Sequence, residues 1–268
     1  MAKIKLILCD IDDTLVHKEL HLNEKVIRII RKVQQEGVHF TLATGRMPYR
    51  AQNFAEEAGL TIPYIANNGS ILYDRGKYVY AKKVYAGQFK VLFRRYMETN
   101  SGFTVIFSYD DRERPLVATE WIAAREHKYK GYNEPLGNTD DVWNQEVHKV
   151  YIVDDARSGI IGEIAGCLRA MNGSFSFFPY QQYSMEIVAS GCSKASGLTS
   201  LLEYLGITKE EVMAIGDHTN DMEVIQMAGI GVAVANAQEE LKAVADYVTR
   251  EERAEGVIEA IETFVLQS

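Results

Sequence analysis

The sequence has little of what cross-linked, membrane-spanning or nucleic-acid-binding proteins require. Its 268 residues include only three cysteines and no C-x-x-C pair, which argues against a disulfide framework and a cysteine-based zinc site. No apolar run approaches the roughly 20 residues of a membrane helix. The formal net charge of -8 argues against non-specific nucleic-acid binding, which needs a basic face. We therefore expect neither a membrane nor a nucleic-acid partner.

The amino terminus also lacks a targeting signal. Its first apolar stretch covers about five residues before a group of aspartates, which is shorter than the roughly 7–15 apolar residues of a signal peptide. Together with the scattered cysteines, this predicts a cytoplasmic protein. Hydrophobic residues make up 47% of the chain and charged residues 25%, so there is ample material for a packed core. Length alone allows one large domain or two moderate ones.

Short apolar strands alternate with amphipathic helices at both ends of the chain. The first part predicts strands over 4–9, 38–43 and 63–66, helices over 23–36 and 49–58, and a hairpin over 71–80. The last third predicts strands over 212–215 and 230–234 and helices over 195–205, 221–227, 238–244 and 254–264. This alternation predicts an α/β fold with a doubly wound parallel sheet. Chemistry in such sheets gathers at the carboxyl ends of the strands.

The middle of the chain follows a different order. It predicts helices over 88–98, 121–130 and 160–171, strands over 103–109, 147–153, 174–179 and 183–188, and a charged turn over 110–114. This is an α+β pattern. We therefore predict a core domain formed by residues 1–82 and 190–268, with residues 83–189 inserted as a second domain.

The first chemically suggestive segment is D-I-D-D-T, directly after the first strand. Strand alternation points Asp10 and Asp12 the same way, and the neighbouring sequence offers no obvious cation. Two carboxylates in one small volume are unfavourable unless a positive charge offsets them. A set of oxygen ligands favours Mg²⁺ over Zn²⁺. The alternative interpretation is an ordinary acidic turn or helix cap.

Three further segments stand at strand ends or helix starts. T-G-R at 44–46 places a hydroxyl and an unhindered N–H at a helix entrance, which suits a phosphate. Lys194 opens a helix, where the macrodipole disfavours a cation unless an anion is bound. G-D-H-T-N-D at 216–221 brings carboxylates and an amide to another strand end. Each segment alone also fits a plain turn, a solvated lysine or a helix cap.

Taken in order, the four segments resemble the four motifs of the haloacid dehalogenase superfamily. They match its D-x-D-x-T loop, its second-motif hydroxyl, its third-motif lysine and its G-D-x-x-N-D motif. The insertion is similar to the cap of the Cof-type (type IIB) subfamily, as are N-G at 68–69 and K-x-x-G-L at 194–198. The chain departs from the pattern at Ser70, where alanine is common, and at Ala235, where glycine is common. The resemblance implies a Rossmann-like core with an inserted α+β cap.

The resemblance also implies a function and roles for individual residues. It implies a Mg²⁺-dependent phosphatase of small phosphorylated metabolites, with sugar phosphates as the default substrates. Asp10 would be the nucleophile that forms an aspartyl-phosphate, and Asp12 would be the general acid and base. The implied metal ligands are Asp10, Asp12 through its backbone carbonyl, Asp217 and Asp221. The implied phosphate-binding or substrate-binding residues are Thr44, Gly45, Arg46, Lys194 and Asn220.

Two other functions remain open at this point. A phosphomutase uses the same two aspartates, and a non-catalytic regulatory protein could bind a phosphometabolite with the same fold. A dehalogenase would not need the second carboxylate or the metal cluster. Within the inserted domain, His127, Tyr132, Tyr183 and Met185 are candidates to face the substrate, although each also fits an ordinary surface or core position. The sequence carries no signal for an oligomeric state.

Overall fold

The structure, a computed structural model, describes residues 3–126, 134–180 and 182–266. It forms two compact units. The first, here called the core unit, comprises Met1–Tyr80 and Ser193–Ser268. The second, the inserted unit, comprises Ala81–Cys192.

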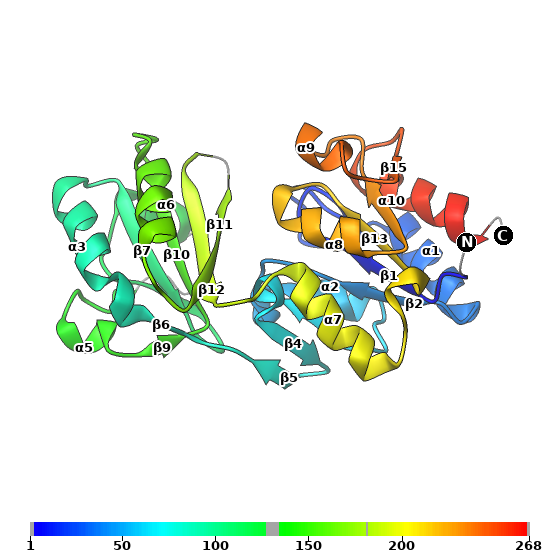
Figure 1. Cartoon of the computed structure of the whole chain (residues 1–268), viewed down its shortest axis with the longest axis horizontal. Helices are drawn as coiled ribbons and strands as arrows, with labels where there is room; N and C mark the ends of the chain where they lie inside the picture. The colour runs from blue at the N-terminus through cyan, green and yellow to red at the C-terminus, as the bar shows by residue number, and fades with distance from the viewer. Residues whose placement is uncertain (1–2, 127–133, 181, 267–268) are drawn as a thin grey trace. The chain divides into compact units, whose positions relative to one another are not determined.

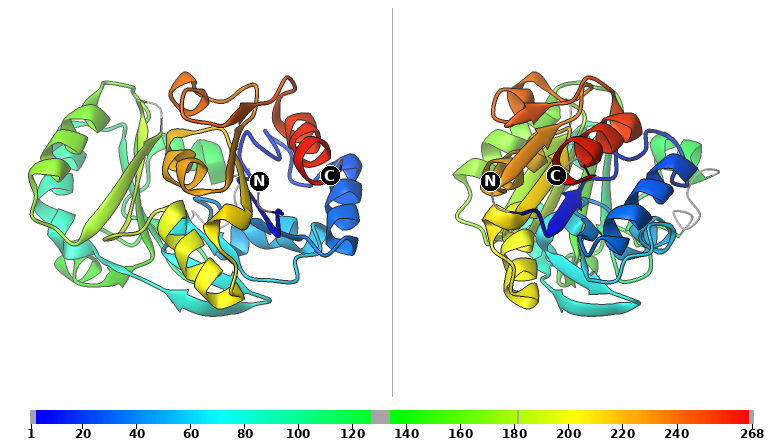
Figure 2. Two further views of the ribbon diagram at one scale, coloured as in Figure 1. Left: turned by 45° about the vertical axis from the view of Figure 1, so that its right-hand side comes forward. Right: turned by 90° about the vertical axis from the view of Figure 1, so that its right-hand side faces the viewer.

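The core unit is built on a five-stranded parallel sheet. Its strand order is β15-β14-β13-β1-β2, with bounds β1 Leu6–Cys9, β2 His39–Leu42, β13 Val212–Gly216, β14 Ile230–Ala233 and β15 Tyr247–Val248. Segments from the two ends of the chain lie side by side, because blue β1 pairs with β13, which pairs in turn with β14 (Figure 2). All four residues of β1 are buried, as expected for a strand whose sheet is covered on both faces.

Six α-helices of the described core unit accompany this sheet: α1 Glu24–Gln35, α2 Pro48–Glu57, α7 Lys194–Leu205, α8 Met222–Met227, α9 Glu239–Lys242 and α10 Arg253–Ile261. Helix α1 begins at Asn23, whose side chain accepts hydrogen bonds from two backbone N–H groups of the first turn. Helix α10 packs beside α1 and continues into a π-helix, Glu262–Leu266. The blue and red helices lie on one side of the sheet, and yellow α7 with α8 lies on the other (Figure 2).

Strand β1 occupies the point where the winding of the sheet reverses. Its neighbours are β2 on one side and β13 on the other, so the chain leaves β1 in one direction and later extends the sheet in the opposite direction. Ligands of open α/β sheets bind at such a point, outside the carboxyl ends of the strands. The predicted doubly wound parallel sheet is therefore confirmed, and the strand that precedes Asp10 lies at its switch point.

A small antiparallel sheet extends the core unit. It consists of β3 Tyr64–Ala66, β4 Ile71–Asp74 and β5 Lys77–Ala81, and a bridge between Ala43 and Ile65 ties it to the end of β2. The predicted hairpin is present, and both of its turn residues, Arg75 and Gly76, have left-handed backbone, as a type I′ turn requires.

The inserted unit contains a five-stranded antiparallel sheet with the order β11-β12-β10-β7-β8. Its bounds are β7 Phe103–Ser108, β8 Glu113–Pro115, β10 Lys149–Asp154, β11 Phe175–Tyr180 and β12 Ser184–Ala189. Helices α3 Lys90–Thr99 and α6 Ile160–Ala170 share one apolar core with this sheet (Figure 1). Helix α4 Glu120–Glu126 packs through Trp121 and Ile122 in a separate cluster with Ile106 and Val153. The shorter elements are β6 Val84–Tyr85, which pairs with β9 Glu146–Val147, and α5 Asp140–Trp143.

Two predictions for the inserted unit are wrong in detail. The charged turn ends at Arg112, because the buried Glu113 begins an edge strand and accepts a hydrogen bond from Ser108 Oγ at 3.3 Å. The predicted strand over 147–153 is divided at His148, whose Nε2 contacts Asp110 Oδ1 at 2.6 Å. Of the helix predicted over 121–130, the part beyond residue 126 lies outside the described residues. The elements β6, β15 and α5 were not predicted, because two to four residues show no periodicity.

Within the described residues, no helix has both the length and the apolar character needed to cross a membrane.

Candidate active site

The loop after β1 turns sharply and carries Asp10 at its start. Asp10 N donates to Ile215 O at 3.0 Å, which extends the β1–β13 ladder by one bond and places Asp10 directly at the strand end. The backbone N–H groups of Leu15 and Val16 both donate to Ile11 O, at 2.9 and 3.0 Å. These two hydrogen bonds to one carbonyl oxygen close a tight turn. Asp10 is therefore held in place by the sheet, and the residue is only 6% exposed.

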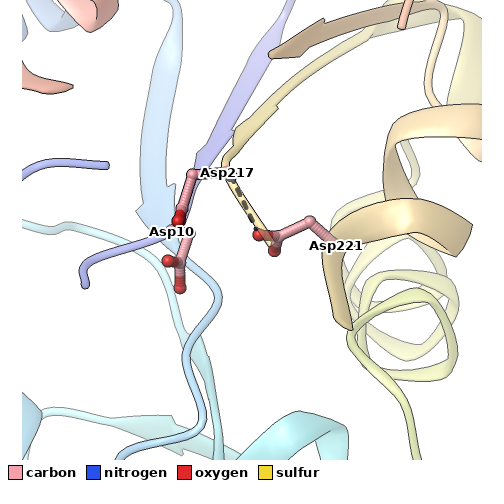
Figure 3. Close-up of side chains that lie close together, drawn as sticks. All are labelled: Asp10, Asp217 and Asp221. Carbon is pink, nitrogen blue, oxygen red and sulfur yellow. Dashed lines mark hydrogen bonds between the residues drawn. The ribbon is translucent and has the colours of Figure 1, made fainter. Parts of the chain in front are cut away.

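The segment after β13 supplies two further buried carboxylates. Asp221 Oδ2 accepts a hydrogen bond from the backbone N–H group of Asp217 at 3.2 Å (Figure 3). It accepts a second one from the backbone N–H group of His218, also at 3.2 Å. A Cβ atom on Gly216 would lie 2.5 Å from Asp221 Cγ, so only glycine allows the aspartate to fold back against the strand end. The carboxylate of Asp217 accepts a hydrogen bond from the Thr14 hydroxyl at 2.9 Å. That bond joins the D-I-D-D-T segment after β1 to the G-D-H-T-N-D segment after β13.

Asp10, Asp217 and Asp221 form a compact acidic cluster. One carboxylate oxygen from each lies within 4.8 Å of the others, and all three residues are buried. Figure 3 shows Asp10 and Asp217 at the ends of neighbouring strands, with Asp221 across from them. Three oxygen donors from separate residues around one small space are the ligands that hard divalent cations prefer. We refer to these three residues as the acidic cluster.

Lys194 lies inside this cluster. It is the first residue of α7, it is 1% exposed, and its Nζ donates to Asp10 Oδ1 and Asp221 Oδ1, both at 2.6 Å. The interpretation as a solvated lysine is therefore wrong. Two carboxylates, 184 and 27 residues away in the sequence, balance a cation that the helix start disfavours.

Two glycines set the position of α7 and so of Lys194. Gly69 has φ of +82°, and a Cβ atom there would lie 1.9 Å from Ser193 O. A Cβ atom on Gly197 would lie 2.5 Å from Ile65 Cγ2. The turn after β3 thus rests directly on the first turn of α7, so a side chain at either glycine would force the two segments apart.

Burial and crowding change the proton affinities of the cluster. Burial raises the pKa of Asp10 well above its usual range, and Lys194 opposes this only partly. Burial and the nearby Asp221 raise the pKa of Asp217 to about 7. Burial lowers the pKa of Lys194, but Asp10 and Asp221 more than reverse that effect, so its pKa rises overall. One ammonium group faces three carboxylates, and the cluster therefore has the electrostatic character of a cation site.

Asp12 has a separate environment from Asp10. Its carboxylate is 52% exposed and forms a bidentate ion pair with Arg46, with Nε–Oδ2 at 2.9 Å and Nη2–Oδ1 at 2.6 Å. The Arg46 guanidinium also lies 4.8 Å from the ring centroid of Phe54. The positive charge that two neighbouring carboxylates require is present, with Lys194 beside Asp10 and Arg46 beside Asp12. Both cations come from distant segments, so the local sequence could not reveal them.

The remaining predicted phosphate residues meet through Asn68. Asn68 N donates to Thr44 O at 3.0 Å, and Asn68 Oδ1 accepts from Asn220 Nδ2 at 3.1 Å. The Thr44 hydroxyl oxygen accepts from Arg46 N at 3.1 Å, which leaves its hydrogen to donate elsewhere. Gly45 is half-buried beside them. Sequence reasoning noted Asn68 only in the N-G pair of the Cof-type resemblance and missed that its side chain and backbone connect two of the four motifs.

The candidate substrate-facing residues of the inserted unit have different outcomes. His127 and Tyr132 lie outside the described residues. Met185 is fully buried in the apolar core of that unit, so its interpretation as a core residue is confirmed. Tyr183 is half-buried, and the guanidinium of Arg157 lies 4.9 Å from its ring centroid.

Residues 7–261 match a family described as haloacid dehalogenase-like hydrolase. The chain is 30% identical over 263 residues to the 5-amino-6-(5-phospho-D-ribitylamino)uracil phosphatase YcsE of Bacillus subtilis (strain 168), covering 98% of this chain and 96% of that one. It is 29% identical to the phosphoglycolate phosphatase of Methanosarcina acetivorans, covering 97% and 96%. A haloacid dehalogenase-like hydrolase from Bacteroides thetaiotaomicron has a similar crystal structure, with a TM-score of 0.81, 29% identity and coverage of 97% and 99%.

Proposed function

The chain belongs to the haloacid dehalogenase-like hydrolases, and from this membership and the site we propose a Mg²⁺-dependent phosphatase that works through an aspartyl-phosphate on Asp10. The chain is a phosphoric monoester hydrolase that acts on phosphorylated small molecules. The proposal of Mg²⁺ and an aspartyl-phosphate rests on the buried Asp10 carboxylate, which pairs with Lys194 at 2.6 Å beside Asp217 and Asp221.

The proposed reaction has two steps. In the first, a carboxylate oxygen of Asp10 attacks phosphorus, the bond from phosphorus to the alcohol oxygen breaks, and Asp12 gives a proton to the departing alcohol. In the second, water attacks phosphorus, Asp12 accepts the water's proton, and inorganic phosphate leaves with the Asp10 carboxylate restored. Arg46 holds the Asp12 carboxylate in a fixed orientation beside this chemistry.

The acidic cluster fits a divalent cation. Asp10, Asp217 and Asp221 would hold Mg²⁺, together with the Asp12 carbonyl, and the ion would offset the negative charge of Asp10 and of the substrate phosphate. The protein's own groups do the rest. Lys194 neutralises phosphate oxygens, while the Thr44 hydroxyl and the Gly45 N–H position them, and Asn220 holds the turn from β3 against this edge.

We further propose that the substrates are phosphate monoesters of sugars or polyols. The name of the Bacillus relative contains a phosphorylated ribityl chain, and that of the Methanosarcina relative contains a small phosphorylated acid. The shared element is a phosphate ester on the terminal CH2 group of a small carbon chain, and the ribityl chain is a polyol. A phosphomutase would instead return the phosphoryl group to its product, and a panel assay separates the two because only a phosphatase accumulates inorganic phosphate.

The function is tested by phosphate release with and without Mg²⁺. We expect p-nitrophenyl phosphate to be hydrolysed with Mg²⁺ and chelation to abolish the activity. In a panel of a ribityl phosphate, a hexose phosphate and phosphoglycolate, we expect the highest kcat/KM with a sugar or polyol ester. Absence of hydrolysis of every compound in both conditions, at high protein concentration, would contradict the proposal.

Metal binding should depend on pH because Mg²⁺ must displace a proton from the cluster. The pKa of Asp217 is about 7 in the folded metal-free chain, above its unfolded value, so the folded state binds the extra proton and loses stability as pH rises from about 4 to about 7. We therefore expect Mg²⁺ to raise the melting temperature more at about pH 7.5 than at about pH 5.5.

The matched control for this prediction is Asp217→Asn, which cannot titrate. Its Mg²⁺-induced shift should be smaller and should differ less between the two pH values, because Asp10 is then the remaining ligand with a raised pKa. Because both proteins share all histidines, other titrations cancel in the comparison. A wild-type shift as large at the lower pH as at the higher one would contradict the protonation argument.

A further inference from the structure

Two non-glycine residues with left-handed backbone lie on facing loops beside the acidic cluster. Asp13, in the loop after β1, has φ of 56°, and Arg253, at the start of α10, has φ of 51°. Residues other than glycine seldom adopt this conformation, and those that do are held in it by their surroundings. The left-handed backbone of Asp13 and Arg253 must therefore be stabilised by neighbouring groups.

Asn236 bonds to both. Its Nδ2 donates to Asp13 O at 2.8 Å, and its Oδ1 accepts from Arg253 N at 2.8 Å. The amide is planar and rigid, so the two bonds fix the separation of the loops. Ion pairs add little, since Arg253 Nε lies 3.4 Å from Asp13 Oδ1 and both side chains are substantially exposed. The amide of Asn236 is the principal connection.

A short path leads from Asn236 to the acidic cluster. Asp13 O belongs to the peptide group that continues into Thr14, and the Thr14 hydroxyl donates to Asp217 Oδ1 at 2.9 Å. From the other side, Gln238 N donates to Asp217 O at 2.9 Å. The segment 236–238 thus contacts both the loop after β1, at Asp13, and the loop after β13, at Asp217.

The segment that precedes Arg253 is held in place by Glu259. Glu259, on α10, accepts hydrogen bonds from the backbone N–H groups of Arg250 and Glu251 at 2.9 and 3.1 Å. Its side chain is 9% exposed, and Tyr247 Oη donates to it at 2.7 Å. The segment 250–253, which carries Arg253, is therefore fixed to β15 at the sheet edge and cannot shift together with the loop that contains Asp13.

We propose that Asn236 is a positioning residue for the metal site: it holds the Asp13 carbonyl so that Thr14 keeps the Asp217 carboxylate in place beside Asp10 and Asp221. The proposal rests on the proposed function. Outer groups that orient metal ligands typically change affinity about 10- to 100-fold when removed. Asn236→Asp keeps an acceptor for Arg253 N but faces the Asp13 carbonyl with an oxygen, and Asn236→Ala loses both bonds.

The experiment measures Mg²⁺ binding by calorimetry, phosphate release as a function of Mg²⁺, and the melting temperature in chelator. Both variants should bind Mg²⁺ about 10-fold or more weakly, while saturating Mg²⁺ restores most of kcat. A merely structural role would lower the melting temperature without moving the affinity. The matched control is Asn53→Ala, which also removes an amide donor to a backbone carbonyl, that of Leu20, and it should leave Mg²⁺ affinity unchanged.

The outcomes separate the inference from the proposed function. If the wild-type protein binds no Mg²⁺ and releases no phosphate, the proposed function is wrong and the inference fails with it. If the wild type binds and turns over but both Asn236 variants match its affinity, or Asn53→Ala loses as much, only the inference is overturned. Should Asn236→Ala fail to fold, Asn236→Asp carries the test because it keeps the bond to the start of α10.

Discussion

Asp10→Asn should lower turnover of a phosphate monoester by about 10⁴-fold or more, the scale seen when a nucleophile is removed from an enzyme. An amide oxygen can still accept the hydrogen bond from Lys194, so the side chain keeps its shape and its closest partner. It cannot form the aspartyl-phosphate, because an amide is a far weaker nucleophile than a carboxylate. Phosphate release under saturating Mg²⁺ measures the loss.

The control for this substitution is Asp154→Asn in the inserted unit. Asp154 is also buried, and its carboxylate accepts hydrogen bonds from Ser158 Oγ and Gly159 N, which close a loop before α6. We expect it to change stability but not the chemical step. Acid-quenched wild-type protein should also gain the mass of one phosphoryl group on Asp10 during turnover. If Asp10→Asn retained more than trace activity, Asp10 would be a metal ligand and not the nucleophile.

The sequence was sufficient for the fold and for the identity of the cluster. Buried strands such as β1 and β13 are continuous apolar runs, and parallel strands bring their carboxyl ends to one edge. That geometric rule alone predicts that Asp10 and Asp217 meet, although 207 positions separate them along the chain. The same rule places Thr44 at the same edge, after β2.

What the sequence could not supply were the partners of these groups. Strand alternation treated Asp10 and Asp12 as equivalent, but in the folded chain Lys194 pairs with one and Arg46 with the other. Each pairing depends on a helix whose position is set by long-range packing, such as that of Gly69 on the start of α7. The role of Asn236 was hidden for a related reason, because its bonds join backbone atoms that carry no residue-specific signal.

Lys194→Met should destabilise the metal-free protein by about 3–5 kcal/mol, the cost of removing one partner from a buried ion pair. Methionine fills much of the same space, but the carboxylates of Asp10 and Asp221 lose their 2.6 Å contacts with the ammonium group. Urea denaturation in chelator near neutral pH measures the change. Lys149→Met is the matched control, because Lys149 is also buried and pairs with Glu186 in the inserted unit.

The two lysine variants should differ in their response to Mg²⁺. Lys194 and a divalent cation both neutralise the acidic cluster, so removing the lysine should leave Mg²⁺ affinity equal or stronger and let the ion restore part of the lost stability. Turnover should still fall by about 10²-fold or more, since Mg²⁺ cannot replace the charge that Lys194 directs at the phosphate oxygens. Lys149→Met should show no such rescue. Weaker Mg²⁺ binding by Lys194→Met would mean that Lys194 organises the carboxylates more than it competes for them.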